Sequence, residues 1–252
     1  MHFTALGTGT IALSASRACA GYLIEHDDAV VLLDCGSGIA RRLVEMDAPW
    51  RAVTHVVLSH FHIDHYGDLA TLIFAWKYGQ LPARTAPLDI VGPPGTGALL
   101  QRLAAAHGSW VLDPGYAVRV TEVAPGTEVD LAPGLRLAAC KVPHSPESVA
   151  YSMTAGGKRL VYTGDTGFDE AFAAWARDCD VLLCECSLPE DMRIAEHLTP
   201  EQCGALAQLV RPGRLVLTHL YPPVETVDIA AAVAARYTGP LVVAFDGWQT
   251  EL

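Results

Sequence analysis

The sequence predicts an α/β protein built from mixed β-sheets that are flanked by helices. Apolar, strand-length runs rich in β-branched residues each end abruptly in a polar residue, and helical patterns lie between these runs. Continuous apolar runs are typical of strands buried on both faces, and such strands need helices on the outer faces of their sheets. No linker, low-complexity tract or long charge run divides the chain, so one domain is expected over residues 1–252.

Each element is predicted from its local pattern. Four runs predict buried strands at Val30–Gly36, Thr54–His60, Arg159–Asp165 and Arg214–His219. Alternating stretches predict hairpin strands at Ala117–Val123, Leu135–Val142 and Val149–Ala155, with a turn at Gly156-Gly157. Helical patterns cover Ile39–Met46, Asp68–Tyr78, Thr96–His107, Asp169–Arg177, Pro200–Val210 and Val227–Arg236. Folds of this kind bind ligands in the loops at strand ends, so the chemistry is expected there.

Composition restricts the classes of partner and the cellular compartment. The chain has 17 basic and 28 acidic residues and a net charge of −11, so its surface repels polyanions and a long nucleic acid is not expected as substrate. No segment stays apolar for the roughly 18 residues that a membrane span needs, so we expect a soluble, cytoplasmic protein. The seven cysteines are scattered and never form a CxxC pair, which indicates reduced thiols.

The segment His60-Phe61-His62-Ile63-Asp64-His65 carries the strongest chemical signal. Four side chains of metal-binding type follow directly after the predicted strand Thr54–Ser59. In an extended loop, His60 and His62 can bind one ion, while Asp64 and His65 can turn toward a second. The alternative is a surface loop that is rich in histidine by chance. The position of the segment directly after a buried strand disfavours that interpretation.

Three further residues of metal-binding type each end an apolar run: His144, Asp165 and His219. Any one alone is more typical of a satisfied core or capping residue. Together with the first segment they form a set of five histidines and two carboxylates, which suits two metal ions bridged by one carboxylate and a hydroxide. Asp165 can be the bridge because a carboxylate has two oxygens, whereas each imidazole offers one free nitrogen.

In this order the motifs resemble those of the metallo-β-lactamase superfamily. The resemblance covers residues 3–219 and includes, besides the seven residues above, Leu6-Gly7-Thr8-Gly9-Thr10, Leu33-Asp34-Cys35-Gly36, Thr163-Gly164-Asp165-Thr166 and Thr218-His219. It implies an αβ/βα sandwich of two mixed β-sheets. It also implies a first ion on His60, His62 and His144, a second on Asp64, His65 and His219, Asp165 as the bridge, and a structural role for Asp34.

The resemblance also bears on cofactors and assembly. Two divalent ions per chain are implied, with zinc expected and manganese, iron or cobalt as alternatives, because mixed nitrogen and oxygen sites accept all of these metals. Many members of the superfamily are dimers, so a homodimer is a further expectation. Tyr221, two residues after His219, is a weak candidate for the wall of the substrate pocket.

A narrower resemblance is to the ribonuclease Z branch and its phosphodiesterase relatives. It rests on Leu182-Leu183-Cys184-Glu185-Cys186-Ser187, followed by Ala195-Glu196-His197-Leu198-Thr199-Pro200-Glu201-Gln202, in which His197 and Thr199 open a predicted helix. The resemblance implies that His197 lies beside the metals and assists departure of the leaving oxygen, and Glu185 would orient it. The simpler interpretation is that Thr199 caps the helix and His197 is merely exposed.

One departure from that branch concerns the substrate. Short-form ribonuclease Z enzymes insert a long arm that grips transfer RNA in the interval between His144 and Asp165, and only 21 positions separate these residues here. Processing of tRNA 3′ ends is therefore disfavoured. A small-molecule or short nucleotide phosphodiester is a better expectation.

These observations predict a dinuclear metal-dependent hydrolase, most simply a phosphodiesterase. Two dications would lower the pKa of a bridging water toward neutrality and so supply a hydroxide nucleophile. Asp64 could accept the proton of that water, and His197 could protonate the leaving oxygen. A lactone or carboxylic-ester hydrolase of the same fold is the alternative, and an inactive metal-binding regulator is a third class.

Overall fold

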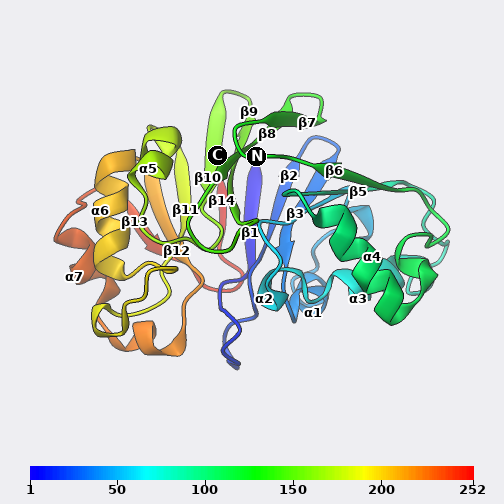
Figure 1. Ribbon diagram of the computed structural model, residues 1–252, viewed down its shortest axis with the longest axis horizontal. Helices are drawn as coiled ribbons and strands as arrows, with labels where there is room; N and C mark the ends of the chain where they lie inside the picture. Colours follow the sequence, from blue (N-terminus) through cyan, green and yellow to red (C-terminus); the bar gives the residue numbers. More distant parts are fainter.

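Two seven-stranded β-sheets lie face to face in the computed structural model, which describes residues 1–252 (Figure 1). The first sheet has the strand order β14-β1-β2-β3-β4-β5-β6 and the second has the order β13-β12-β11-β10-β9-β8-β7. The strands of the first sheet are β1 (His2–Gly7), β2 (Gly21–His26), β3 (Ala29–Cys35), β4 (His55–Val57), β5 (Leu88–Gly92), β6 (Val118–Glu122) and β14 (Gln249–Glu251). Those of the second are β7 (Glu128–Ala132), β8 (Leu135–Lys141), β9 (Val149–Ala155), β10 (Lys158–Tyr162), β11 (Val181–Glu185), β12 (Arg214–Thr218) and β13 (Leu241–Val243).

Helices cover the outer face of each sheet, and this arrangement confirms the predicted fold class (Figure 1). On the side of the first sheet lie α1 (Ile39–Glu45), the short α2 (Ile63–Tyr66), α3 (Leu69–Tyr78) and α4 (Thr96–His107). On the side of the second sheet lie α5 (Glu170–Ala176), α6 (Pro200–Val210) and α7 (Ile229–Ala234). Short 3₁₀ helices occupy Trp50–Ala52, Ser109–Val111, Glu190–Met192 and Pro222–Thr226.

Three clusters of buried apolar side chains fill the spaces between these layers. One cluster lies between the two sheets and includes Tyr22, Tyr151 and Tyr162. A second combines the outer face of the second sheet with α5, α6 and α7, and a third combines the first sheet with α1, α3 and α4. Both faces of the central strands are therefore covered, which is why β3 is buried at every position and appears in the sequence as a continuous apolar run.

Strand direction places the ends of several strands at one edge of the sandwich. β3 pairs in parallel with β4, and β11 pairs in parallel with both β10 and β12. β8 is joined to β10 through two successive antiparallel pairings with β9, so β8 and β10 run in the same direction. The carboxyl ends of these strands meet at the same edge of each sheet, where such folds place their ligands.

The predicted hairpin strand at Ala117–Val123 is observed as β6, but its pairing was predicted wrongly. β6 pairs in parallel with β5 and forms the outer edge of the first sheet, with four of its five residues exposed. The alternating pattern therefore reflects an exposed sheet edge. The two other predicted hairpin strands are confirmed as β8 and β9, and the turn at Gly156-Gly157 joins β9 to β10.

The interval between His144 and Asp165 consists of β9, β10 and their turn, without an inserted arm. All seven cysteines are free. None of the helices combines the length and the hydropathy that crossing a membrane would require.

Candidate metal centre

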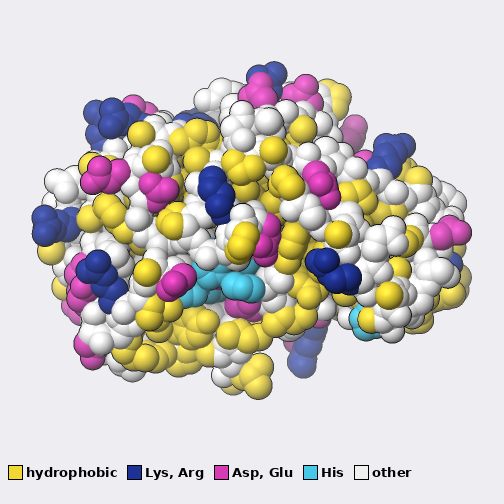
Figure 2. Space-filling view, in the orientation of Figure 1, with side chains coloured by type: hydrophobic (Ala, Val, Ile, Leu, Met, Phe, Trp, Pro, Cys, Tyr) yellow, Lys and Arg dark blue, Asp and Glu magenta, His cyan; other side chains and the backbone are white.

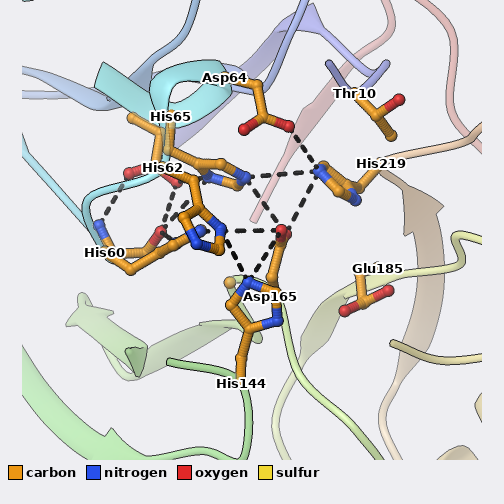
Figure 3. A network of polar contacts seen from close by, with 12 residues as sticks. Thr10, His60, His62, Asp64, His65, His144, Asp165, Glu185 and His219 are labelled. Atoms are coloured by element: carbon orange, nitrogen blue, oxygen red, sulfur yellow. Dashed lines mark hydrogen bonds and ion pairs between the residues drawn. The ribbon is translucent and has the colours of Figure 1, made fainter. Parts of the chain in front are cut away.

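The seven predicted ligand residues converge on one point at the carboxyl ends of the strands, around the carboxylate of Asp165 (Figure 3). They are supplied by the loop after β4 (His60, His62), by α2 (Asp64, His65), and by the segments after β8 (His144), β10 (Asp165) and β12 (His219). α2 packs closely on the end of β3, because a Cβ atom at Gly36 would overlap the carbonyl oxygen of Asp64. The predicted turn of Asp64 and His65 is thus a short helix.

The first group of possible ligands contains His60, His62, His144 and one oxygen of Asp165. Nε2 of His144 lies 3.0 Å from Nδ1 of His62. Oδ2 of Asp165 lies 3.7 Å from Nε2 of His144 and 3.8 Å from Nε2 of His60. Three imidazole nitrogens and one carboxylate oxygen therefore face a common centre.

The second group contains Asp64, His65, His219 and the other oxygen of Asp165. Oδ1 of Asp165 lies 3.2 Å from Nε2 of His65 and 3.4 Å from Nε2 of His219. The two imidazole nitrogens are 3.4 Å apart, and Oδ2 of Asp64 is also 3.4 Å from Nε2 of His219. Since Oδ1 of Asp165 faces this group and Oδ2 faces the first, this carboxylate has the placement that a bridge between two ions needs.

The spacing of these atoms fits metal coordination. Ligands at zinc distances of about 2.0–2.1 Å stand about 3.3 Å apart when they form a tetrahedron, and the distances above run from 3.0 to 3.8 Å. Nε2 of His60 and Oδ1 of Asp165 are buried and have no hydrogen-bond partner, which is costly unless a cation satisfies them. The donor set of imidazoles and carboxylates therefore fits two divalent ions.

Among the protein groups alone, the histidines and carboxylates perturb one another strongly. Burial, and then the charge of His65, hold the pKa of His60 well below its usual value. Burial would raise the pKa of Asp165, but His219 and His65 hold it well below its usual value. Burial would lower the pKa of His65, yet Asp165 and Asp34 raise it well above its usual value. The carboxylates make the electrostatic potential at this cluster of side chains negative, so the cluster attracts either protons or metal cations.

Four of the five ligand histidines have Nδ1 beside a protein group that is not one of the seven ligand residues. Nδ1 of His62 instead faces His144 and the centre of the first group. Nδ1 of His65 lies 2.8 Å from Oδ2 of Asp34, and Nδ1 of His144 lies 3.0 Å from the carbonyl oxygen of Glu196. Nδ1 of His60 and of His219 face serine hydroxyls at 3.1 and 3.0 Å. Partners on Nδ1 leave Nε2 free to face a metal.

Asp34 and His219 adopt backbone conformations that are uncommon for their residue types. Both have a φ of +56°, in the left-handed region. The carboxylate of Asp34 is fully buried and accepts hydrogen bonds from the backbone and hydroxyl of Ser59 and from the hydroxyl of Tyr162. The structure thus gives Asp34 the structural surroundings that the resemblance implied, and the buried contacts oppose the backbone strain.

His197 lies beside the ligands and is not merely exposed. Its ring centroid is 4.9 Å from that of His144 and 5.7 Å from that of His219. Nδ1 of His197 lies 3.0 Å from Oε1 of the fully buried Glu185, which also accepts from the backbone of Leu198. Burial would lower the pKa of His197, but Glu185 raises it to about 9. An imidazolium at this position can donate a proton.

Thr199 begins α6 as predicted. Its side chain accepts from the backbone of Gln202, and the Gln202 side chain accepts from the backbone of Thr199, which completes a capping box. The cap fixes the end of the loop that carries His197. Thr199 therefore caps the helix, while His197 lies beside the ligand residues.

Tyr221, the predicted pocket residue, lies at the edge of the site. Its ring centroid is 5.9 Å from that of His219 and 6.1 Å from that of His197. Burial, together with Asp64 and Asp165, raises its pKa to about 12. Ser59 and Ser187 also belong to the site, and neither was predicted as a site residue. Their only signal was their position beside His60 and two residues after Glu185.

The surface around the site is rich in apolar side chains. Figure 2 shows histidines gathered in a patch near the middle of one face, with hydrophobic side chains below them. Ile63, between two possible ligands, is 48% exposed, and Met192 and Ile194, in the segment before His197, are exposed to a similar extent. These exposed side chains offer apolar contacts to a ligand that binds beside the histidines.

Comparison with known proteins gives a consistent result. The family model described as β-lactamase superfamily domain matches residues 30–220. The "Probable metallo-hydrolase YhfI" of Bacillus subtilis is 29% identical over 211 residues, which cover 82% of each chain. A ribonuclease Z of Mycobacterium bovis is 25% identical over 280 residues, which cover 100% of this chain and 98% of that protein.

Solved structures give the same picture. The crystal structure of YhfI superposes with a TM-score of 0.86 at 26% identity and covers 99% of this chain and 98% of that one. Human tRNase Z, short form, superposes with a TM-score of 0.80 at 21% identity and covers 100% of this chain and 99% of that one. At that identity the second likeness concerns the fold alone.

Proposed function

The chain belongs to the β-lactamase superfamily and is a metallo-hydrolase of that fold, and on this premise we propose that it is a dinuclear phosphodiesterase acting on small or short nucleotide phosphodiesters. The observation that carries this proposal is the placement of His197, paired with Glu185, directly beside two groups of possible ligands that both face Asp165. A nucleophile at the metals and a proton donor next to them are the two requirements of phosphodiester cleavage.

The residues have distinct roles in the proposed reaction. Two divalent ions, held by the two ligand groups, would supply an activated water and neutralise charge on the phosphoryl oxygens. Asp64 has an oxygen 3.4 Å from His219 and is placed to accept the proton of the attacking water. His197, whose Nδ1 pairs with Glu185, would donate a proton to the departing oxygen from its other ring nitrogen.

Two features support a small substrate over a long nucleic acid. The net charge is −11, so the field around the protein repels polyanions. The hairpin of β9 and β10 fills the interval in which a gripping arm would be inserted. Tyr221 and the exposed apolar side chains near the site provide contact for the two arms of a small diester.

Hydrolysis of bis(p-nitrophenyl) phosphate by the purified protein, with metal content determined on the same sample, tests the proposal. We expect turnover that rises with metal content up to two ions per chain and that is lost in Asp165→Ala. Asp28→Ala, which removes an exposed carboxylate from the turn between β2 and β3, is the matched control and keeps full activity. A protein with two bound ions and no turnover on this diester would contradict the proposed substrate class.

A lactone or carboxylic-ester hydrolase is the second candidate. The exposed apolar side chains of Ile63 and Ile194 favour it, because an uncharged ester gains more from such contacts than a phosphodiester does. A panel of activated carboxylic esters and lactones, assayed on the same metal-loaded sample, separates the two. Turnover of these substrates that survives His197→Ala would favour the second candidate, since that reaction does not depend on His197.

A further inference from the structure

A buried carboxylate and a buried serine lie together at the end of the first sheet. Ser59 donates its hydroxyl hydrogen to Oδ2 of Asp34 at 2.7 Å, and both residues are fully buried. The oxygen of Ser59 then faces Nδ1 of His60 at 3.1 Å. Since the only hydrogen of the hydroxyl is used on Asp34, His60 must be the donor in the second contact. Its Nδ1 is therefore protonated and its Nε2, which has no partner, is the free nitrogen.

The second sheet repeats the arrangement with Glu185 and Ser187. Ser187 donates to Oε2 of Glu185 at 2.5 Å, and its oxygen faces Nδ1 of His219 at 3.0 Å. Both are fully buried. The carboxylate is a stronger acceptor than the carbonyl oxygen of His219, which lies 3.2 Å from the same hydroxyl. His219 thus donates to Ser187, and its Nε2 is left for a ligand.

In each pair the carboxylate also contacts another imidazole directly. Asp34 contacts Nδ1 of His65 at 2.8 Å, and Glu185 contacts Nδ1 of His197 at 3.0 Å. One carboxylate and one serine therefore orient two imidazoles in each half of the sandwich. Backbone hydrogen bonds from Ser187 to Leu198 and from Tyr221 to Ser187 fix the second serine between the segments that carry His197 and His219.

We propose that Ser59 and Ser187 are positioning residues, one for each metal ion. Ser59 fixes the tautomer and the ring of His60 in the first ligand group, and Ser187 does the same for His219 in the second. This inference rests on the proposed dinuclear centre and assigns one serine to each half of it. Without the hydroxyl, the Nδ1 hydrogen of the histidine has no partner, and rotation of the ring or the other tautomer removes Nε2 from the centre.

The assignment is tested by measuring zinc affinity, through competition with a chromophoric chelator, in proteins that keep only one of the two ligand groups. Each serine substitution is combined with a second substitution that disables the other group. In a His62→Ala background the second group remains, and in an Asp64→Ala background the first group remains. We expect Ser187→Ala to weaken zinc binding about 10–100-fold in the first background and little in the second, and Ser59→Ala to show the opposite pattern. Ser59→Thr and Ser187→Thr keep the hydroxyl and restore affinity.

The control is Ser152→Ala, which removes a buried hydroxyl that accepts from Arg159 and contacts no ligand. The absorption spectrum of the cobalt-loaded variants gives a second readout, since a displaced imidazole changes the bands of one ion only. Affinities of Ser187→Ala equal to those of the parent, or a loss matched by Ser152→Ala, would overturn this inference while two ions still bind. A wild-type protein that binds no ions would instead overturn the proposed function, and the inference with it.

Discussion

The carboxylate of Glu185 lies 3.0 Å from Nδ1 of His197, and the side chain of Glu185 is completely buried. This contact turns the other ring nitrogen of His197 away from the carboxylate, toward the side chains of the metal centre. Glu185 also accepts hydrogen bonds from the backbones of Thr166 and Leu198. The carboxylate therefore joins the segment after β10 to the loop before α6, and His197 has a defined place beside Asp165.

If His197 is the proton donor, its importance depends on the leaving group. We expect His197→Ala to lower kcat/KM about 10²–10⁴-fold for a diester with an alkoxide leaving group, because an alkoxide must be protonated as it departs. The loss should be much smaller for bis(p-nitrophenyl) phosphate, since p-nitrophenolate leaves without a proton. Kinetics on both substrates check this, with His107→Ala on α4 as the control. Equal losses on both diesters would mean that His197 only binds substrate.

The pH dependence of the same reaction provides a separate test. Burial would lower the pKa of His197, but Glu185 raises it, to about 9 in the metal-free protein, so the rate should fall at alkaline pH as this proton is lost. Glu185→Gln removes the charge that raises this pKa, and the alkaline limb of kcat/KM for the alkoxide diester should move to lower pH. An unmoved alkaline limb in Glu185→Gln would assign that limb to another group.

The same pKa shift has a consequence for stability. Because the folded-state pKa of His197 lies above the unfolded one, its contribution to stability is complete below about pH 6.5 and disappears as the pH rises through about 9. Urea denaturation of the metal-free protein across this range should therefore show a decline toward alkaline pH that is smaller in Glu185→Gln. The pH-dependent part of the difference between the wild-type protein and the variant should vanish above pH 9, while the part that comes from the other hydrogen bonds of Glu185 should persist.

Much of this site was predictable because its residues are tied to local patterns. His60, Asp165 and His219 each follow a buried apolar strand, and strand ends of one direction meet at one edge. The contacts of Ser59 and Ser187 were not predictable, because a serine beside a ligand is common and the tautomer depends on three-dimensional placement. The pairing of β6 was predicted wrongly for a related reason. An alternation of apolar and polar residues indicates which face of a strand is exposed, but it does not indicate which strand lies beside it.

Asp34, near the end of β3, should matter strongly for stability. Asp34→Asn keeps a residue that tolerates the left-handed backbone, but its NH2 group must replace one of two acceptors. These are Oδ1, which accepts from the Ser59 backbone, and Oδ2, which faces the Ser59 hydroxyl, Tyr162 and His65. Removing one partner of such a buried network costs about 3–5 kcal/mol. We expect a loss of this size in the free energy of unfolding of the metal-free protein, measured by urea denaturation. Asp28→Asn, at an exposed position, should leave it unchanged.

Metal removal should lower thermal stability through binding linkage. Zinc at a hundred times its dissociation constant stabilises the folded state by about 2.7 kcal/mol, and each kcal/mol shifts the Tm of a chain of this size by about 2–4 °C. This energy is for one ion, so a chelator that removes two ions should lower the Tm by about 10–20 °C, and added zinc should restore it. The Tm of Asp165→Ala should respond much less to either treatment. A wild-type Tm that is indifferent to chelator would argue against bound ions.

Gly167 offers a way to move His197 without changing its chemistry. A Cβ atom at Gly167 would overlap the carbonyl oxygen of Ala195, two residues before His197, and the Gly167 backbone donates to the carbonyl of Pro143, next to His144. The backbones of both loops are thus packed against one glycine. Gly167→Ala should push the loop of His197 outward, because the overlap is with backbone and no side chain can rotate away.

The expected result is a selective loss. Turnover of the alkoxide diester should fall by at least about tenfold in Gly167→Ala, since displacement of a catalytic group by about 1 Å can cost up to 10²-fold. Two ions should still bind, because the overlap is with the loop of His197, which carries none of the seven ligand residues. Gly97→Ala, within α4, is the matched control, since the nearest atom to its added Cβ is Oε1 of Glu122 at 3.5 Å. The opposite outcome is a lower metal content with an unchanged ratio of the turnover rates on the two diesters. That result would mean that the loop of His144 moves and the loop of His197 does not.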